Sequence, residues 1–377
     1  MRDFIPQIEP WIDGEELSQL TRVIDSTYVT ENDLTAEFEQ MICKLTGSRY
    51  AIAITNGTMA LYCCLKALNI GPGDEVIIPN MTFIASSNAV LLAGATPVLC
   101  DINTLNFCID VDRIKELITP NTKAIMPVHL YGQSCDMDVI TKIAEENNLA
   151  VLEDAAQGVG VKWRGRHVGT FGECGILSFY GNKTITCGEG GVVLTDSIKI
   201  RNKVYQLKNH GRLSKGQFKH ETIGYNFSFT EMQAAVGIAQ MNKLDRIKAK
   251  KEHIRNRYNN ELDTLLKRVP VDNFCSPVWW FTSFLICNKS TLMKYLLTKG
   301  IQTREFFYPL NKQPCYKHME FAGVKTLKPF PNSRTIFNMG ISLPSAYCLT
   351  DEEQTYIIDT INDWCNTPER WYDDPTG

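Results

Sequence analysis

The chain of 377 residues lacks the features that mark several large classes of protein. No apolar stretch approaches the roughly 20 residues of a transmembrane helix, and the first residues lack the apolar core of a secretory signal peptide. The formal net charge is −3, so no excess of positive charge favours nucleic acid or an anionic membrane as a partner. We therefore expect a soluble, cytoplasmic protein that binds neither.

Disulfide and zinc patterns are also missing. The 13 cysteines include no Cys-x-x-Cys pair and no zinc spacing. Their odd number, and places inside apolar runs such as that of Cys100, indicate free thiols in a reducing compartment. Cys187 follows Lys183 by four residues, but nothing supports a redox role for it. The six histidines are scattered singly, so we expect no metal site.

The first part of the chain alternates β-rich runs with helical patterns. The β-rich runs begin at Tyr50, Glu75, Thr96, Lys123, Leu149 and Gly175. Such alternation is typical of βα units, and near-continuous apolar strands predict a mostly parallel sheet that is covered on both faces. Ligands of such sheets bind at the carboxyl ends of the strands.

The pattern changes after about residue 230, where a long charged helical stretch runs from Glu231 to Tyr258 and shorter strand-like pieces follow. We therefore predict an α/β protein with two domains. Residues 1–240 would form a large domain with the mostly parallel sheet, and residues 241–377 a smaller α+β domain. The N-terminal segment is expected to pack on the small domain.

One lysine stands where a surface lysine would not be expected. Lys183 lies in the run Ser178-Phe-Tyr-Gly-Asn-Lys-Thr-Ile-Thr-Cys-Gly-Glu-Gly-Gly191, in which a glycine-rich turn joins two apolar strands. A lysine on such a turn is well placed to form a Schiff base with an aldehyde cofactor. This indicates pyridoxal phosphate (PLP). Without this context it would be one solvated lysine among many. Burial would lower the pKa of its amine and leave it available as a base.

PLP also needs a carboxylate near its pyridine nitrogen and an aromatic ring against its face. Asp154 ends the strand that begins at Leu149 and is the candidate carboxylate, although acids at strand tips are common in α/β proteins. Gln157, one turn further on, could bond the phenolic oxygen. Phe83 follows a strand and opens a helix, which suits either a ring that stacks on the cofactor or a core aromatic.

The phosphate of PLP needs an anion site. The turn Thr55-Asn-Gly-Thr58 joins a strand to a helix, so the amides of Gly57 and Thr58 would lie at a helix N-terminus, which favours anions. Glycine allows close backbone approach there, although Asn-Gly is also a plain turn signal. The hydroxyl of Ser178 would complete the phosphate site.

Four further residues are candidates with two interpretations each. His129 follows a strand, which favours a structural role. His210 lies on an expected loop and is a candidate substrate contact. Arg304 and Tyr308 are candidates to face the substrate, and a structural role suits them equally.

Taken in order, these motifs resemble the sugar-nucleotide aminotransferases of the DegT/DnrJ/EryC1/StrS family. The matching pieces are Thr55-Asn-Gly-Thr-Met-Ala-Leu61, Gly71-Pro-Gly-Asp-Glu-Val76, Val128-His-Leu-Tyr-Gly132, Glu153-Asp-Ala-Ala-Gln157, Ser178-Phe-Tyr-Gly-Asn-Lys183, Gly188-Glu-Gly-Gly191 and Gly224-Tyr-Asn-Phe227. The resemblance covers nearly the whole chain. It implies a fold-type I PLP-dependent transferase with the architecture of aspartate aminotransferase.

The resemblance also implies roles for the matching residues. Lys183 would be the Schiff-base lysine, Asp154 the partner of the pyridine nitrogen and Gln157 the neighbour of the phenolic oxygen. Phe83 would lie on the ring face.

Three matching residues would hold the phosphate. Thr58 and Ser178 would bind it from the same chain, and Asn226 would reach it from the neighbouring subunit. The resemblance therefore implies a homodimer with shared active sites.

Two segments indicate the substrate by resemblance. Gly300-Ile-Gln-Thr-Arg304 and Phe307-Tyr-Pro-Leu-Asn-Lys-Gln-Pro314 are most similar to GDP-perosamine synthases and related 4-aminotransferases. Such enzymes move an amino group from glutamate to C4 of a nucleotide-linked 4-keto-6-deoxyhexose, which gives a 4-amino-4,6-dideoxyhexose of the perosamine or viosamine type. The relatives usually have histidine in place of Asn311 and often arginine in place of Ser228, so the sugar and the nucleotide stay open.

Other reactions remain as alternatives: a PLP-dependent sugar dehydratase or lyase of the same fold, and a 3-aminotransferase of a 3-keto sugar nucleotide. A dehydratase branch of the family carries histidine at the position of Lys183, so the lysine favours transamination. A nicotinamide enzyme is disfavoured because no Gly-x-Gly-x-x-Gly follows the first strand. A PLP-binding regulator would require loss of a core group, whereas Lys183, Asp154 and Ser178 are all present.

Overall fold

The computed structural model describes residues 2–214, 216, 218–316, 326 and 329–367. Its largest element is a seven-stranded sheet with the strand order β1-β9-β8-β5-β4-β2-β3. The strands are β1 (Tyr50–Ile54), β2 (Glu75–Pro79), β3 (Thr96–Cys100), β4 (Thr122–Ile125), β5 (Ala150–Asp154), β8 (Cys174–Ser178) and β9 (Gly191–Thr195). Only β9 runs antiparallel to its neighbours in this sheet, so the predicted, mostly parallel α/β sheet is confirmed.

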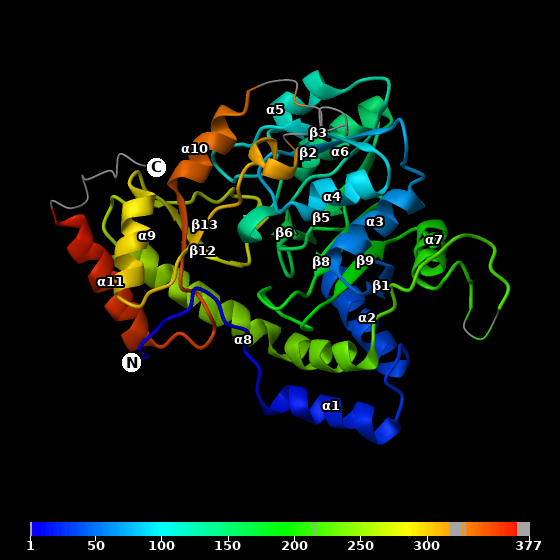
Figure 1. Cartoon of the computed structure of the whole chain (residues 1–377), viewed down its shortest axis with the longest axis horizontal. Helices are drawn as coiled ribbons and strands as arrows, with labels where there is room; N and C mark the ends of the chain where they lie inside the picture. Colours follow the sequence, from blue (N-terminus) through cyan, green and yellow to red (C-terminus); the bar gives the residue numbers. More distant parts are fainter. Residues whose placement is uncertain (1, 215, 217, 317–325, 327–328, 368–377) are drawn as a thin grey trace.

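Helices cover both faces of this sheet (Figure 1). In β1, Ile52 and Ile54 belong to the core shared with α3 (Gly57–Ala67), α4 (Ala85–Leu92) and α7 (Ile198–Lys208). Ala51 and Ala53 point the other way, toward α2 (Asp33–Thr46), α6 (Met137–Asn147) and the start of α8 (Glu231–Glu261). Alternate strand residues are thus buried on opposite faces, which explains why the strands are almost continuously apolar.

A second unit is built on a four-stranded antiparallel sheet, in the order β10 (Lys267–Arg268), β12 (Thr282–Leu285), β14 (Gly340–Leu343) and β13 (Arg304–Glu305). Helices α9 (Lys289–Thr298) and α11 (Asp351–Cys365) share its core with the C-terminal part of α8. Helix α10 (Pro331–Met339) leads directly into β14. A small sheet of β11 (Cys275–Ser276), β6 (Lys162–Trp163) and β7 (Arg166–His167) joins the two units.

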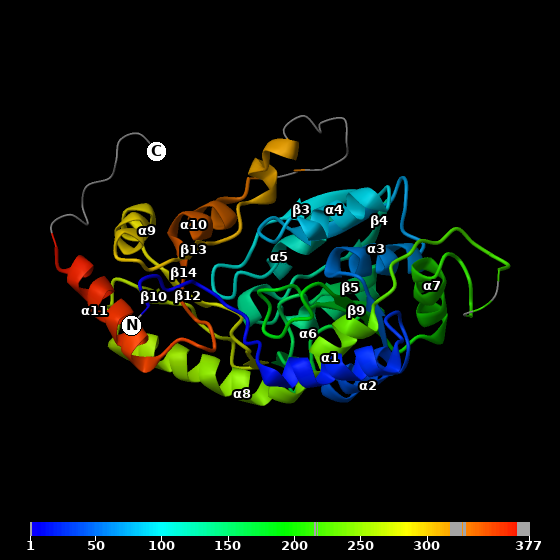
Figure 2. The same ribbon diagram turned by 60° about the horizontal axis from the view of Figure 1, so that its bottom comes forward.

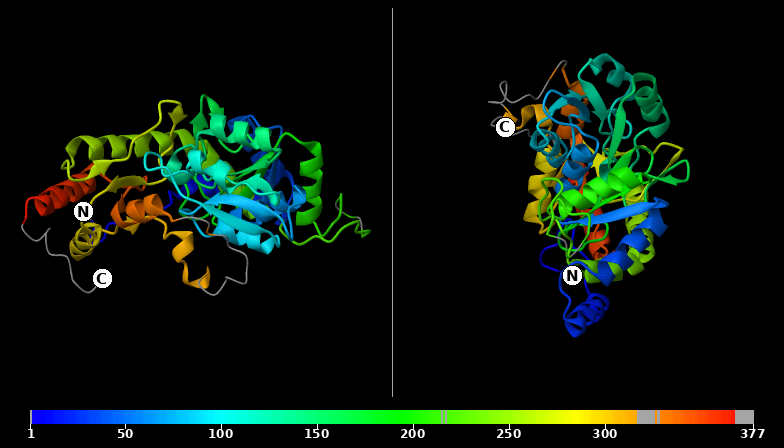
Figure 3. Two further views of the ribbon diagram at one scale, coloured as in Figure 1. Left: turned by 90° about the horizontal axis from the view of Figure 1, so that it is seen from above. Right: turned by 90° about the vertical axis from the view of Figure 1, so that its right-hand side faces the viewer.

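Helix α8 connects the two units along one side of the molecule (Figures 2 and 3). It spans the expected domain boundary at residue 240, so the division into residues 1–240 and 241–377 stays a prediction. Near the N-terminus, the amide of Ile5 donates to the carbonyl of Gly300 at 2.8 Å, while α1 (Gly14–Ser26) packs on α8. No helix in the described ranges is both long and apolar enough to cross a membrane.

The start of α8 is joined to the start of α2 through one buried carboxylate. Glu231 accepts hydrogen bonds from the amides of Asn32, Leu34 and Thr35 at 2.7, 2.7 and 2.9 Å, and from the hydroxyl of Thr35 at 2.7 Å. These amides lie at a helix N-terminus, where donors lack partners within the helix and negative charge is favoured. Glu231 therefore fixes the helix that crosses between the units to the large sheet.

We predict that Glu231→Gln lowers the free energy of unfolding by about 3 kcal/mol, because the new amide group would face N–H donors and the charge would be lost. Urea unfolding followed by circular dichroism measures this change. Glu261→Gln is the matched control, since Glu261 ends the same helix in a half-exposed pair with Arg257, and such pairs contribute below about 0.5 kcal/mol. Equal stability of the two variants would contradict the role of Glu231.

Candidate active site

Three strand ends meet at one edge of the large sheet. Strands β1, β5 and β8 run in the same direction, so Thr55, Asp154 and Ser178 lie along a common rim. Gly57, two residues after Thr55, lies close to Ser178: a side-chain carbon added to Gly57 would lie 3.1 Å from Cβ and 3.3 Å from Oγ of Ser178. The turn after β1 and the end of β8 thus face each other, as the sequence predicts.

A candidate anion site lies where these two ends meet. Helix α3 begins at Gly57, and Asn56 caps it by accepting from the amide of Met59 at 3.0 Å. The amides of Gly57 and Thr58 have no acceptor within the helix, so they are available to an anion together with the Ser178 hydroxyl. The backbone of Gly191 also lies close to that of Gly57. A side-chain carbon at position 191 would lie only 2.7 Å from the Gly57 amide nitrogen.

Asp154 is buried at the end of β5 and held by two donors. Its Oδ2 accepts from the Ser86 hydroxyl at 2.7 Å, and its Oδ1 accepts from the amide of Ala156 at 3.1 Å. A carboxylate fixed in this way suits a protonated ring nitrogen, because a buried negative charge favours a cation beside it.

Gln157 and Phe83 supply the other groups that PLP needs. The Gln157 side-chain oxygen accepts from the amide of Tyr131 at 2.7 Å, which leaves its Nε2 to donate to a phenolic oxygen. Phe83 is 56% exposed, with its ring centroid 6.0 Å from that of Phe307. This exposure excludes the core-aromatic interpretation and leaves a ring face open to a ligand.

Lys183 is a partly buried residue whose amine lies against an aromatic ring. Its Nζ lies 4.1 Å from the centroid of the Trp280 ring. Burial lowers the pKa of the Lys183 amine to about 8, while Asp154 raises it and Arg304 lowers it further. The amine can therefore take up and release a proton near neutral pH.

These residues fit pyridoxal phosphate. A side-chain carbon at Gly57 would crowd Ser178 in the candidate anion site after β1, the carboxylate of Asp154 is fixed, and burial lowers the pKa of the Lys183 amine. Lysine, carboxylate, aromatic face and phosphate site are the groups that hold this cofactor in proteins. The structure brings all four to the same rim.

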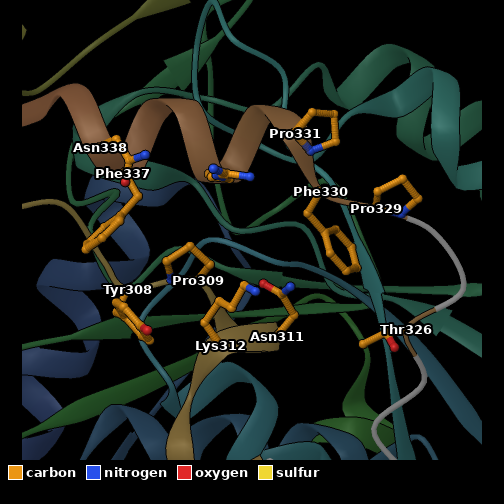
Figure 4. Close-up of a pocket in the computed structure, with 11 residues that line it drawn as sticks. Tyr308, Pro309, Asn311, Lys312, Thr326, Pro329, Phe330, Pro331, Phe337 and Asn338 are labelled. Atoms are coloured by element: carbon orange, nitrogen blue, oxygen red, sulfur yellow. The ribbon is translucent and has the colours of Figure 1, made fainter. Parts of the chain in front are cut away.

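The substrate candidates Tyr308 and Asn311 line a cleft of about 720 Å³ beside α10 (Figure 4). Asn311 is fixed by Asn80, which follows β2: the Asn80 amide donates to Asn311 Oδ1 at 3.0 Å, and the Asn311 backbone amide donates to Asn80 Oδ1 at 2.9 Å. Arg304 begins β13, its guanidinium 5.0 Å from the centroid of the Phe281 ring.

Two predicted residues lie on the segment that follows α7 and projects from the rest of the chain (Figure 1). His210 and Asn226 are both exposed, and neither side chain hydrogen-bonds to Lys183 or Asp154 in the structure of the single chain. The segment is nevertheless joined to the rim, because the carbonyl of Phe227 accepts from the amide of Thr55 at 3.1 Å.

His129 is buried and has partners at both ring nitrogens. Its Nε2 lies 3.0 Å from Glu153 Oε2, and its Nδ1 accepts from the amide of Cys135 at 3.2 Å. The structure therefore supports the structural role that its sequence position favours.

The sequence analysis missed Ser86, Asn80 and Trp280. Ser86 follows Phe83 by three residues at the start of α4, so helical spacing could have indicated it. Asn80 directly follows β2 at the same sheet edge. No local pattern marks Trp280, which reaches Lys183 from a distant part of the chain.

Comparisons with known proteins give one consistent family. The model of the DegT/DnrJ/EryC1/StrS aminotransferase family matches residues 10–362. The GDP-perosamine synthase of Escherichia coli O157:H7 is 36% identical over 365 residues, 96% of this chain and 98% of its own. That of Caulobacter vibrioides is 37% identical over 358 residues, 93% and 95% of the two chains.

Solved structures share the fold. DesV of S. venezuelae, solved in complex with a ketimine intermediate, has a TM-score of 0.89 at 29% identity, covering 97% of this chain and 99% of its own. The 3-amino-5-hydroxybenzoic acid synthase has a TM-score of 0.88 at 26% identity, covering 95% and 98%.

We predict that the Lys183 amine reacts with an amine-specific reagent at a rate that rises with pH through a midpoint near 8, because the unprotonated form is the nucleophile. Labelling of the full chain, freed of cofactor and analysed by peptide mass spectrometry, gives this midpoint. Surface lysines in the same digest are the internal control. A midpoint near the ordinary lysine value of 10.5 would contradict the burial of this amine.

Proposed function

Since this chain belongs to the DegT/DnrJ/EryC1/StrS aminotransferase family, we propose that it moves an amino group from glutamate to C4 of a nucleotide-linked 4-keto-6-deoxyhexose. The product would be a 4-amino-4,6-dideoxyhexose of the perosamine or viosamine type. The chain is an enzyme, a PLP-dependent aminotransferase of fold type I, as the sequence predicts. Its similarity to GDP-perosamine synthases over almost their whole length supports the choice of substrate.

The observation that carries the proposal is the presence of Lys183 at a rim that also holds Asp154 and the anion site. Bound PLP supplies a ring that withdraws electrons from the carbon where a proton leaves or arrives. Asp154, fixed by Ser86, would keep the ring nitrogen protonated. The amides of Gly57 and Thr58 and the Ser178 hydroxyl would hold the phosphate.

Lys183 would move protons in both halves of the reaction. Because the pKa of its amine is about 8, the amine can take a proton from glutamate and later return one to the sugar carbon. One base that serves two successive substrates implies ping-pong kinetics. The dehydratase branch that the family contains has histidine at this position, so the lysine favours amino transfer.

The cleft beside α10 is the proposed place of the nucleotide. Lys312 lines it together with the aromatic rings of Tyr308 and Phe330 (Figure 4). Arg334 is a further lining residue. Cations suit a diphosphate, and aromatic faces suit a nucleobase. Asn311, whose side-chain oxygen accepts from Asn80, would present its side-chain amide group as a donor to the same cleft.

We also propose a cytoplasmic homodimer. The exposed Asn226 would reach the neighbouring active site, as the resemblance implies. The same projecting segment exposes large apolar side chains, with Phe218 at 88% and Ile223 at 83%, which a second copy would cover. None of the 13 cysteines, all of which lie in the described ranges, forms a disulfide, which suits a reducing compartment.

We predict that purified enzyme with PLP and glutamate converts one member of a panel of nucleotide 4-keto-6-deoxysugars to an amine. The panel would carry GDP, UDP and dTDP, and mass spectrometry with fragmentation would locate the nitrogen at C4. Nitrogen at C3, or loss of a hydroxyl without gain of nitrogen, would contradict the proposal.

Lys183→Ala is the control variant for that panel. It should form no amino sugar, because the proton-moving amine is gone, yet still bind pyridoxamine phosphate through Asp154 and the anion site. Undiminished turnover would remove Lys183 from the reaction.

We predict that Arg334→Ala raises the KM for the sugar nucleotide about tenfold or more, because a charged hydrogen bond to phosphate is lost. The half-reaction with glutamate should stay unchanged, since glutamate carries no nucleotide. Arg164→Ala is the matched control, a half-exposed arginine paired with Asp138 away from the cleft. Equal KM values for the two variants would place the nucleotide elsewhere.

A further inference from the structure

Trp280 lies against the reacting lysine although it belongs to the second unit of the fold. It precedes β12 in the sequence and is only 2% exposed. The centroid of its ring is 4.1 Å from Lys183 Nζ, within the range at which an indole face attracts an ammonium group.

The indole is fixed from two directions. Its Nε1 donates to the carbonyl of Asn182 at 2.6 Å, the residue just before Lys183. Its own carbonyl accepts from the buried Lys251 amine of α8 at 2.9 Å, and Lys251 also donates to the carbonyl of Ser345 at 3.2 Å. Trp280 is therefore held both to the turn that carries Lys183 and to the helix that crosses between the units.

Aromatic neighbours keep the indole plane in one orientation. The ring of Phe281 stacks on it at 3.8 Å with an interplanar angle of 22°. Tyr131 and Phe307 are nearly parallel to it, at 6.3 and 6.2 Å with angles of 17° and 24°. A ring packed this closely has little freedom to turn its face away from Lys183.

The charges around Lys183 explain why the indole face of Trp280 affects the ammonium form of this lysine. Burial disfavours the ammonium form, Arg304 of β13 also disfavours it, and Asp154 of β5 favours it. In the proposed function, Asp154 pairs with the ring nitrogen of the cofactor. Once the cofactor is bound, the negative charge of Asp154 therefore acts on that nitrogen as well as on Lys183. The indole face is a neutral partner that stabilises the ammonium form without binding it covalently.

We propose that Trp280 is a positioning residue that holds the Lys183 amine at the rim whenever this amine is not bonded to the cofactor. The proposal rests on the proposed function, because it takes Lys183 as the reacting amine. Trp280 keeps the free amine within reach of the reacting carbon and steadies its protonated form between the two proton transfers. Lys251 supports this role by fixing the Trp280 backbone to α8.

Substitution of Trp280 tests this role in the full chain. Trp280→Leu removes the aromatic face, and Trp280→Phe keeps a weaker one. Trp279→Leu is the matched control, because Trp279 is as buried but its ring lies against Arg255 and its Nε1 donates to Glu252. The first readout is the pH midpoint for labelling of Lys183 in the chain freed of cofactor, and the second is the kinetics of the holoenzyme.

Loss of the aromatic face destabilises the ammonium form, so Trp280→Leu should lower the labelling midpoint by roughly one pH unit. Trp280→Phe should lower it by a few tenths of a unit, and Trp279→Leu should leave it unchanged. In the holoenzyme, Trp280→Leu should lower kcat about tenfold or more with the KM for glutamate nearly unchanged, because the binding of glutamate is untouched. Trp280→Phe should restore most of the loss.

An unchanged or raised midpoint in Trp280→Leu would overturn the proposal, as would equal kcat values for the Leu and Phe variants. If circular dichroism shows that Trp280→Leu does not fold, the test depends on Trp280→Phe. An unchanged labelling midpoint of Lys183 in Trp280→Phe then overturns the proposal. Labelling needs neither glutamate nor sugar. A wrong sugar assignment therefore leaves this result untouched, whereas an unchanged midpoint in an active aminotransferase overturns only the role of Trp280.

Discussion

The burial of one amine at the edge of a parallel sheet is the constraint on which the active site depends. Lys183 can act as a base near neutral pH because apolar surroundings disfavour its charged form. Two units meet at this amine: β8 brings the turn that carries the lysine, and the chain before β12 brings Trp280, whose ring face offsets part of the cost of burying the charge. Helix α8, fixed at its start by Glu231, keeps the two units together.

Much of this site could be predicted because its groups lie on local motifs. Asp154 and Ser178 each end an apolar strand, and the turn ending in Thr58 follows another; parallel strands bring their carboxyl ends to one edge. Strand positions were predictable for the same reason, since burial on both faces makes each run apolar. Contacts between distant segments carry no such pattern, so Trp280 and the pairing of Asn80 with Asn311 became evident only in the fold.

The proposed reaction site and the proposed nucleotide cleft occupy different parts of the molecule. The rim with Lys183 and Asp154 belongs to a fold shared with a 3-amino-5-hydroxybenzoic acid synthase as well as with DesV. The cleft beside α10 is lined by Asn311 and Arg334, on segments of the second unit. With the nucleotide in this cleft, as we propose, a family motif would identify amino transfer readily, while the sugar would depend on a few side chains around the cleft.

The most direct test of the account is to trap the cofactor on the chain. Borohydride reduction of the full-length holoenzyme, followed by peptide mass spectrometry, should place the cofactor on the peptide that contains Lys183. Prior treatment with glutamate should abolish this label. Lys251 is the informative alternative, since burial also lowers the pKa of its amine to about 8. Label on Lys251, or on any lysine other than Lys183, would contradict the account.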